Sequence, residues 1–286
     1  MKETIKKLIA LFLAVLPMPC MLAVVRWIPR LTGLVPSDRE FIFYNYLGSL
    51  RVHIHTRFEI EKRILNGVYD KAILSLVRRF VKPDSVCLDI GANAGAITLA
   101  LAHHAEPHGK VFAFEPGIAA YTRLCANIDL NQQVKAVATP VNQGMADKES
   151  KIYWIEHQGQ PGNGSIIPDQ RPGALPIEVT TVDAFCAARS LAKINFVKID
   201  VEAMEYEVIA GGMATWRSSK PVIVYESILG FEKQRNRPVF REIETMLAGL
   251  GYRFYRIDNN GGLTATHYPN LSVNTLALPD SIQTML

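Results

Sequence analysis

After Pro83 the chain has a regular pattern, in which short apolar runs are each followed by a stretch with helical spacing. Short apolar runs, typical of buried strands, occur at 86–90, 111–115, 134–141, 195–200, 222–226, 252–257 and 273–278. Stretches with helical spacing are found at 94–103, 118–131, 182–192, 202–211 and 238–249. This order predicts an α/β fold with a largely parallel sheet and helices on both of its faces.

An uncharged segment, residues 8–25, precedes this region, with lysines on its amino side and arginines on its carboxyl side. Pro17 and Pro19 each remove a helical hydrogen bond, so we expect two short apolar helices rather than one span of a bilayer core about 30 Å thick. Such a segment is typical of a hairpin or in-plane anchor at a membrane surface. The alternatives are packing against protein and a cleaved signal peptide, although a small-residue cleavage site is missing.

The chain therefore divides into three predicted parts, which are an apolar segment (1–36), a connecting region (37–82) and an α/β domain (83–286). Within the α/β domain, residues 159–176 are rich in Gly, Pro, Asn and Gln. This composition predicts an irregular loop, placed where a substrate lid could lie.

Composition narrows the possible functions. Of the 286 residues 49% are hydrophobic, enough for a full-sized core, which excludes a disordered chain. The four cysteines lie far apart without C-x-x-C spacing, so neither a disulfide framework nor a zinc site is predicted. A net charge of +4 is too small to favour nucleic acid as the partner.

The sharpest motif is a glycine-containing turn after the first predicted strand, with the sequence DIGANAG over residues 89–95. Gly91 and Gly95 allow a ligand to approach the backbone, and the following helix offers free N–H groups, which is typical of nucleotide binding. The dinucleotide pattern G-x-G-x-x-G is absent from this turn. Asp89 would repel a pyrophosphate but could accept a hydrogen bond from an ammonium group, as in S-adenosylmethionine.

A second acidic residue, Glu115, ends the next predicted strand 26 residues later. A carboxylate at this position can accept hydrogen bonds from both hydroxyls of a ribose. Each feature alone also has a structural explanation, since a glycine turn can be only a turn and Glu115 can cap the next helix. Their order and spacing together favour a cofactor that contains a nucleoside.

With these motifs the chain resembles the FkbM family of S-adenosylmethionine-dependent methyltransferases over residues 69–278. The resemblance rests on the turn at 89–95, FEP at 114–116, Asn127 with Asn131, TVD at 181–183, KIDVE at 198–202 and VYE at 224–226. It implies a Rossmann-like, seven-stranded class I methyltransferase sheet whose last strand is antiparallel. It also implies O-methylation of a hydroxyl on a sugar, a glycolipid or a secondary metabolite.

The resemblance assigns cofactor contacts to Asp89, Gly91, Asn93, Gly95, Glu115, Asn142 and Asp147. The first four would line the methionine part, Glu115 would hold the ribose, and the segment between the last two would lie near the adenine. One position departs from the family pattern. The family usually continues Asp-x-Glu with glycine, whereas Ala203 follows Glu202 in this chain. If this position has a positive φ or touches substrate, the alanine should alter the pocket.

Methyl transfer to oxygen needs the nucleophile and the methyl carbon in line about 3 Å apart, and a base for the hydroxyl proton. Asp200 and Glu202, at the end of the fourth predicted strand, are the candidate catalytic carboxylates, because paired carboxylates raise one pKa toward neutrality. Glu226, Asn163 and Ser165 are candidate substrate contacts. The three acids could also hold Mg²⁺, but so loose a pattern does not favour a metal site.

The expected function is a methyltransferase on the cytoplasmic side of a membrane, peripheral or monotopic, because its cofactor is made in the cytosol. Its acceptor would be a small-molecule, glycan or lipid-linked hydroxyl. A nicotinamide-dependent oxidoreductase is one alternative, although the dinucleotide turn and a Tyr-x-x-x-Lys pair are missing. A catalytically silent membrane-associated scaffold is another, suggested by Ala203. A nucleic-acid methyltransferase is less favoured, because a basic stripe with interleaved aromatic residues is missing. The sequence leaves the oligomeric state open.

Overall fold

The computed structural model describes residues 9, 38–67, 69–156, 162, 164–167, 170–258, 261–266 and 273–285. The chain forms two compact units, residues 1–69 and 70–286. Apart from residue 9, the predicted apolar segment 8–25 lies outside the described residues. Within the part of the chain that is described, no helix combines the length and the apolar character needed to cross a membrane.

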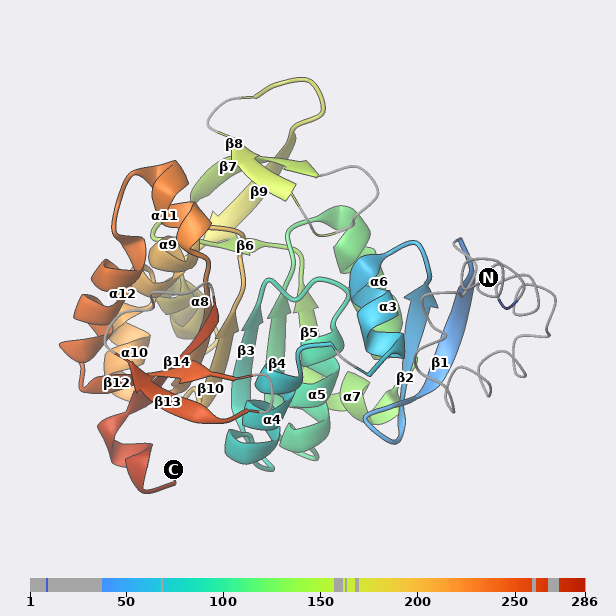
Figure 1. The fold of residues 1–286 in the computed structure, drawn as a ribbon, viewed down its shortest axis with the longest axis horizontal. Helices are drawn as coiled ribbons and strands as arrows, with labels where there is room; N and C mark the ends of the chain where they lie inside the picture. Colours follow the sequence, from blue (N-terminus) through green and yellow to red (C-terminus); the bar gives the residue numbers. More distant parts are fainter. Residues whose placement is uncertain are drawn as a thin grey trace. The chain divides into compact units, whose positions relative to one another are not determined.

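The smaller unit contains an antiparallel hairpin followed by a short helix (Figure 1). These elements are β1 (Glu40–Tyr46), β2 (Leu50–His55) and α3 (Glu59–Leu65). In β2 the side chains of Leu50, Val52 and Ile54 are buried, whereas the residues between them are not. This period of two is expected of a strand with one packed face.

The larger unit is built on a sheet with eight strands among the described residues, in the order β13-β12-β14-β11-β10-β3-β4-β5. Their bounds are β3 (Val86–Ile90), β4 (Lys110–Phe114), β5 (Ala138–Val141), β10 (Phe196–Ile199), β11 (Val222–Ser227), β12 (Tyr252–Ile257), β13 (Leu263–Thr266) and β14 (Val273–Pro279). Strands β11, β10, β3, β4 and β5 are parallel, and β14 runs antiparallel to both β11 and β12. The predicted methyltransferase sheet with an antiparallel last strand is confirmed. Strand β13 pairs with β12 and adds an eighth strand at the edge.

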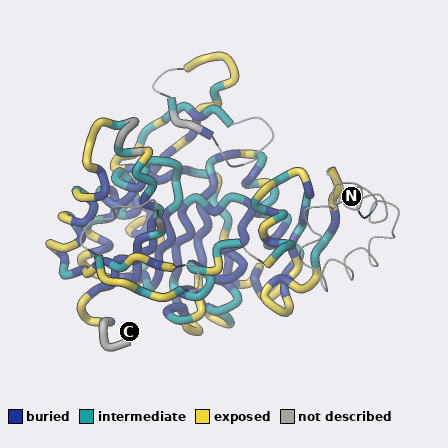
Figure 2. Tube along the Cα trace, in the orientation of Figure 1, coloured by how far each residue is buried: buried dark blue, intermediate teal, exposed yellow. Residues whose placement is uncertain are grey.

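Helices cover both faces of this sheet (Figure 1). The helices of this unit are α4 (Lys71–Phe80), α5 (Ala96–Ala105), α6 (Ile118–Asp129), α7 (Gln132–Val137), α8 (Val182–Ala188), α9 (Glu205–Ala210), α10 (Met213–Ser219), α11 (Leu229–Arg235) and α12 (Val239–Ala248), with a 3-10 helix at Asp280–Met285. Apolar residues of α8, α9, α10 and α12 pack with one face of the strands in a single buried core. The central strands are accordingly buried along their length (Figure 2).

Two predicted elements have different bounds in the structure. The apolar run at 134–141 divides between α7 and β5, because Val134 and Val137 are three residues apart and both buried, a spacing that suits one face of a helix. The helix expected from residue 202 begins at Glu205. Glu202 and Ala203 have φ values of 52° and 81°, which a right-handed helix cannot include.

A second sheet occupies part of the region expected to be an irregular loop, and it corrects that expectation. Its strands are β6 (Gly144–Met145), β7 (Ser150–Glu156), β8 (Gly164–Ile167) and β9 (Leu175–Thr180), in the order β6-β9-β7-β8. Trp154, Ile177 and Val179 form a small core on it with Ala146. The segment pairs through its backbone, which composition does not reveal.

Two residues of the TVD motif have structural roles. The Thr181 hydroxyl caps α8 by accepting a hydrogen bond from the N–H of Ala184 (2.9 Å). The Asp183 carboxylate accepts from the N–H groups of Ala214 (3.0 Å) and Thr215 (2.8 Å) at the start of α10. These bonds join two helices, so this motif stabilises the fold.

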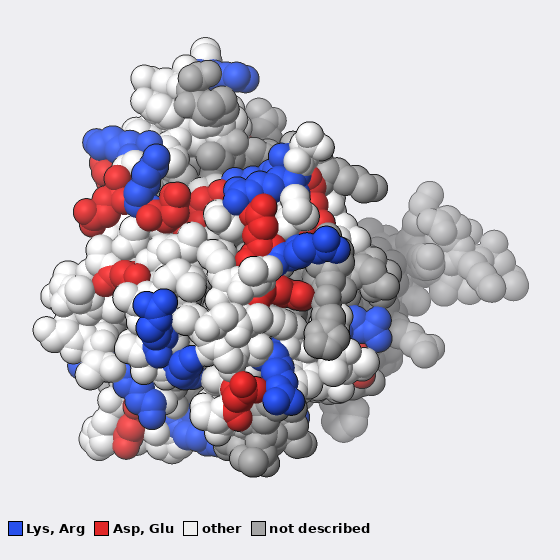
Figure 3. Space-filling model, turned by 90° about the vertical axis from the view of Figure 1, so that its left-hand side faces the viewer, with Lys and Arg blue, Asp and Glu red and all other residues white. Residues whose placement is uncertain are grey.

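On the face drawn in Figure 3, basic and acidic side chains lie next to one another. Exposed ion pairs include Arg253 with Asp280 (2.8 Å) and Arg237 with Glu242 (2.5 Å). On this face the charges of both signs are interspersed, unlike the concentrated basic surface that binds a phosphate backbone.

Candidate functional site

The turn after β3 forms the centre of the candidate site. Gly91 (φ 78°) and Gly95 (φ 88°) adopt left-handed backbone conformations that favour glycine, and Asn93 adopts one too (φ 50°). The N–H groups of Gly91 and Ala92 donate to the carbonyl of Phe114 at the end of β4 (3.0 and 2.9 Å). These bonds fix the turn to the neighbouring strand.

Glu115, which follows β4, holds the same turn through its side chain. Its Oε2 accepts a hydrogen bond from the N–H of Asn93 (2.8 Å), and its Oε1 accepts from the N–H of Gly117 (2.8 Å). Burial raises the pKa of Glu115 to about 7, although the two N–H groups oppose the rise. Each carboxylate oxygen has a further lone pair, so this group can still accept from ribose hydroxyls.

Asp89, on β3, is fully buried and lies next to polar groups of two other elements. Its Oδ2 accepts from the Thr98 hydroxyl on α5 (2.6 Å), and its Oδ1 lies 3.5 Å from Lys198 Nζ on β10 without accepting a hydrogen bond. The same Nζ donates to the carbonyl of Gly91 (2.5 Å) and lies 3.3 Å from Asp200 Oδ2. A buried cation thus links the glycine turn to the end of β10.

Four carboxylates gather where β10 and β11 end. Asp200 and Glu202 follow β10, Glu205 begins α9, and Glu226 belongs to β11. Burial, followed by the charges of Asp200 and Glu202, raises the pKa of Glu205 to about 7. Burial, together with the charges of the other three acids, raises the pKa of Glu226 to about 8. This end of the sheet therefore holds groups that exchange protons near neutral pH.

The remaining predicted site residues are placed as follows. Asn142 follows β5 and donates from Nδ2 to the carbonyl of Glu115 (2.9 Å), so it lies beside the proposed ribose contact. Asp147 is exposed, and its backbone lies against Gly211 at the end of α9. Asn163 lies outside the described residues, and for Ser165 only the backbone, in β8, is described. The roles of these residues remain predictions.

Sequence reasoning gave no site role to three buried polar residues. Lys198 is 2% exposed and Glu205 is 1% exposed. Asn127, on α6, donates from Nδ2 to the carbonyl of Ala94 in the glycine turn (2.7 Å). Lys198 could have been found from its place within a short apolar strand, because a buried charge needs a partner. The burial of Glu205 depends on where α9 begins, which the sequence did not show.

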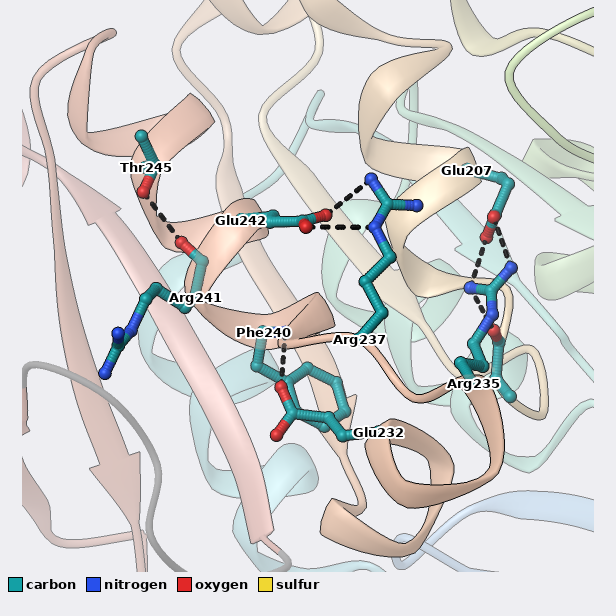
Figure 4. A network of polar contacts seen from close by, with 9 residues as sticks. Glu207, Glu232, Arg235, Arg237, Phe240, Arg241, Glu242 and Thr245 are labelled. Carbon is teal, nitrogen blue, oxygen red and sulfur yellow. Dashed lines mark hydrogen bonds and ion pairs between the residues drawn. The ribbon is translucent and has the colours of Figure 1, made fainter.

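A network of ion pairs holds α11 next to the segment after β10 (Figure 4). Arg235 binds Glu207 of α9 through both of its terminal nitrogens (3.0 and 2.5 Å). Its Nη1 also donates to the carbonyl of Ala203 (3.0 Å). The backbone of Ala203 is therefore held in its left-handed conformation by a side chain from another helix.

Replacing Ala203 by glycine is expected to stabilise the protein by about 0.5–1 kcal/mol, because φ is 81° at this position and glycine adopts such a value without strain. Urea unfolding of the two proteins measures the difference. Ala187, an exposed residue of α8, is the matched control, since glycine there should cost up to about 1 kcal/mol. If glycine lowered the free energy of unfolding equally at both positions, Ala203 would not be under backbone strain.

The residues present fit S-adenosylmethionine. Asp89 Oδ1 is a buried carboxylate oxygen without a hydrogen-bond donor, and each Glu115 oxygen accepts a hydrogen bond from one backbone N–H. Both are suited to the ammonium and hydroxyl donors of this cofactor. Among the described residues, no three His, Cys, Asp or Glu side chains are arranged to hold a metal ion.

Comparison with known proteins assigns the family. Residues 89–254 match the methyltransferase FkbM domain. The chain is 28% identical over 199 residues to hexuronic acid methyltransferase AglP of Haloferax volcanii, covering 69% of this chain and 78% of that protein. It is 26% identical over 161 residues to 2-O-methyltransferase NoeI of Sinorhizobium fredii, covering 51% of this chain and 63% of that protein.

The solved structures that it is similar to include methyltransferase FkbM from Methylobacillus flagellatus, with 13% identity and a TM-score of 0.45. That match covers 76% of this chain and 52% of the other, so the chain spans about half of that protein. The FkbM domain match includes the glycine turn, Glu115 and the carboxylates at the ends of β10 and β11. The match to the FkbM domain, residues 89–254, extends over more than half of the 286 residues. The chain therefore belongs to the FkbM family of S-adenosylmethionine-dependent methyltransferases.

Proposed function

We propose that the protein transfers a methyl group from S-adenosylmethionine to a hydroxyl of a sugar, a glycolipid or a secondary metabolite. The observation that carries this proposal is the direct attachment of the glycine turn to the acidic end of β10. The N–H of Asp200 donates to the carbonyl of Ile90, the residue before Gly91 (3.0 Å). A cofactor bound at the turn would therefore have carboxylates beside it.

In this proposal Asp89, Gly91, Asn93 and Gly95 hold the methionine part of the cofactor, Glu115 holds the ribose, and Asn142 and Asp147 lie near the adenine. The bound cofactor supplies an electrophilic methyl carbon on a sulfonium. The task of the protein is to hold the acceptor oxygen in line with that carbon and to accept its proton.

Asp200 is the proposed base, with Glu202 beside it. The Asp200 side chain is 35% exposed and can meet an incoming hydroxyl, whereas Glu205 is 1% exposed. Because burial and the neighbouring acids raise the pKa of Glu226 to about 8, its carboxyl carries a proton at neutral pH. A protonated carboxyl can donate a hydrogen bond to the acceptor oxygen, which supports the role of Glu226 in substrate binding.

The choice of a hydroxyl acceptor is supported by two relatives whose names state their chemistry. One is a hexuronic acid methyltransferase and the other is a 2-O-methyltransferase. Their identities of 28% and 26% leave room for a different acceptor, so the substrate class is a proposal for this chain.

We also propose that residues 8–25 anchor the protein on the cytoplasmic side of a membrane. This rests on the uncharged sequence of the segment and on the two prolines that divide it. A membrane-surface position would suit a lipid-linked acceptor. Deletion of residues 1–30 should move the protein from the membrane fraction of a cell extract to the supernatant, and unchanged fractionation would contradict the anchor.

The test of the enzymatic activity is incubation with radiolabelled S-adenosylmethionine and extracts separated into lipid, glycan and small-molecule fractions. Label should enter one fraction, and Asp200→Ala should lower its rate of entry by about a hundredfold or more. Asp129→Ala is the matched control, because Asp129 lies in an exposed ion pair with Lys135. Tight cofactor binding without transfer in any fraction would favour a silent scaffold instead.

A further inference from the structure

Lys198 occupies a position that the register of the sheet determines. Strands β10 and β3 are parallel, and Lys198 is the pairing partner of Asp89. The next residues along this row are Ala113 on β4 and Val224 on β11, which are apolar. The row therefore contains one adjacent pair of opposite charges in a buried setting, where an unpaired charge would be strongly unfavourable.

The Lys198 ammonium has three oxygen atoms around it that belong to different parts of the site. They are the carbonyl of Gly91 (2.5 Å), Asp89 Oδ1 (3.5 Å) and Asp200 Oδ2 (3.3 Å). Lys198 therefore donates a hydrogen bond to the turn, and its positive charge lies beside a carboxylate on the strand before the turn and beside the proposed base.

The two backbone segments that Lys198 connects, the glycine turn and the end of β10, are also in direct contact. A Cβ added to Gly91 would lie 1.8 Å from the carbonyl oxygen of Asp200, so the turn and the end of β10 touch without room between them. A displacement of either segment would consequently change the position of the other and of Lys198.

We propose that Lys198 is a positioning residue that connects cofactor binding at the glycine turn to the placement of Asp200. The inference rests on the proposed function of this site. Lys198 contributes a fixed positive charge that holds the Gly91 carbonyl and both carboxylates, so that the turn has its binding conformation before the cofactor arrives. Loss of the ammonium should therefore weaken binding even though Lys198 is not assigned a contact with the cofactor.

Calorimetric titration of the full chain with S-adenosylhomocysteine tests this inference. Lys198→Met is expected to weaken binding at least about tenfold, because the Gly91 carbonyl and Asp89 lose their partner. Lys198→Arg keeps the charge and several donors, so it should recover at least part of the affinity. Lys151→Met is the matched control and should bind like the unaltered chain, since Lys151 forms an exposed ion pair with Glu178.

Equal affinity of Lys198→Met and the unaltered chain would overturn the inference but not the proposed function. Failure of the unaltered, folded chain to bind S-adenosylhomocysteine would contradict the proposed function itself. Circular dichroism of each variant establishes that it is folded.

A second measurement keeps the inference testable if Lys198→Met does not fold. In the unaltered chain labelled with ¹³C-lysine, the Cε resonance of Lys198 is identified by its absence from the spectrum of Lys198→Arg. Saturating S-adenosylhomocysteine should shift this resonance and leave that of Lys151 in place. An unchanged Lys198 resonance at saturation would overturn the proposed connection.

Discussion

S-adenosylhomocysteine is expected to bind about tenfold more tightly at pH 8 than at pH 6, because of the ionisation of Glu115. Burial raises the pKa of this carboxyl to about 7. Because the pKa is raised in the folded state, protonation of Glu115 also contributes to the free energy of unfolding. This contribution is fully present below the ordinary pKa of 4.5 and is lost as the pH rises through about 7. Ribose hydroxyls donate to the ionised form, so the ligand binds best after the proton has left.

The variant Glu115→Gln isolates this effect, because its amide does not ionise. Its NH₂ group would face the N–H of either Asn93 or Gly117, both of which the carboxylate now accepts. We therefore expect binding about tenfold to a hundredfold weaker at pH 8, with a dissociation constant that does not change between pH 6 and 8. Calorimetry at several pH values measures both quantities.

Two other acids titrate in the same range, so the comparison needs a control. The pKa is raised to about 7 for Glu205 and to about 8 for Glu226. Glu178→Gln changes an exposed glutamate in an ion pair and should keep the full pH dependence. If Glu115→Gln kept it as well, the dependence would belong to the acids near Asp200, and the ribose assignment would lose its support.

The parts of the site that lie next to one another in the sequence were predictable. The glycine turn follows a buried strand, and the positions of Gly91 and Gly95 are set by local backbone conformation, with φ values of 78° and 88°. Glu115 is recognisable because it ends the next strand. Such features depend on a few neighbouring residues, and an apolar run followed by glycines identifies them.

The contacts made through strand pairing were not predictable in the same way. Lys198 meets Asp89 only because β10 pairs with β3 in one particular register. A shift of one residue would place Lys198 on the opposite face of the sheet. The sheet of β6 to β9 was missed for a similar reason, since its strands pair through their backbones across segments rich in Gly and Pro.

At Ala203 the sequence pattern identified a position where the backbone conformation decides the effect of the residue. The departure from the usual glycine mattered only if the position had a positive φ, and the structure has φ at 81°. The donated hydrogen bond from Arg235, 32 residues further along the chain, could not be inferred from the motif.

Replacing Gly91 by alanine is expected to destabilise the protein by about 3–5 kcal/mol, the largest loss that we predict for a single methyl group. The added Cβ would lie 1.8 Å from the carbonyl oxygen and 2.8 Å from the carbonyl carbon of Asp200. Both atoms belong to a backbone whose N–H is bonded to Ile90, so neither can move without disturbing the pairing of β10 with β3.

Gly173→Ala is the matched control for this substitution. Gly173 has a similar φ of 84°, but nothing lies within 4 Å of a Cβ added there. Gly173→Ala should therefore lower the free energy of unfolding by about 1–2 kcal/mol, from backbone strain alone. Urea unfolding of the three proteins gives the difference between the two variants, which measures the collision with Asp200. Equal losses would mean that the turn and the end of β10 can separate at little cost. In that case the close attachment of the cofactor turn to the proposed base, on which the proposed methyl transfer to a hydroxyl depends, would not exist in solution.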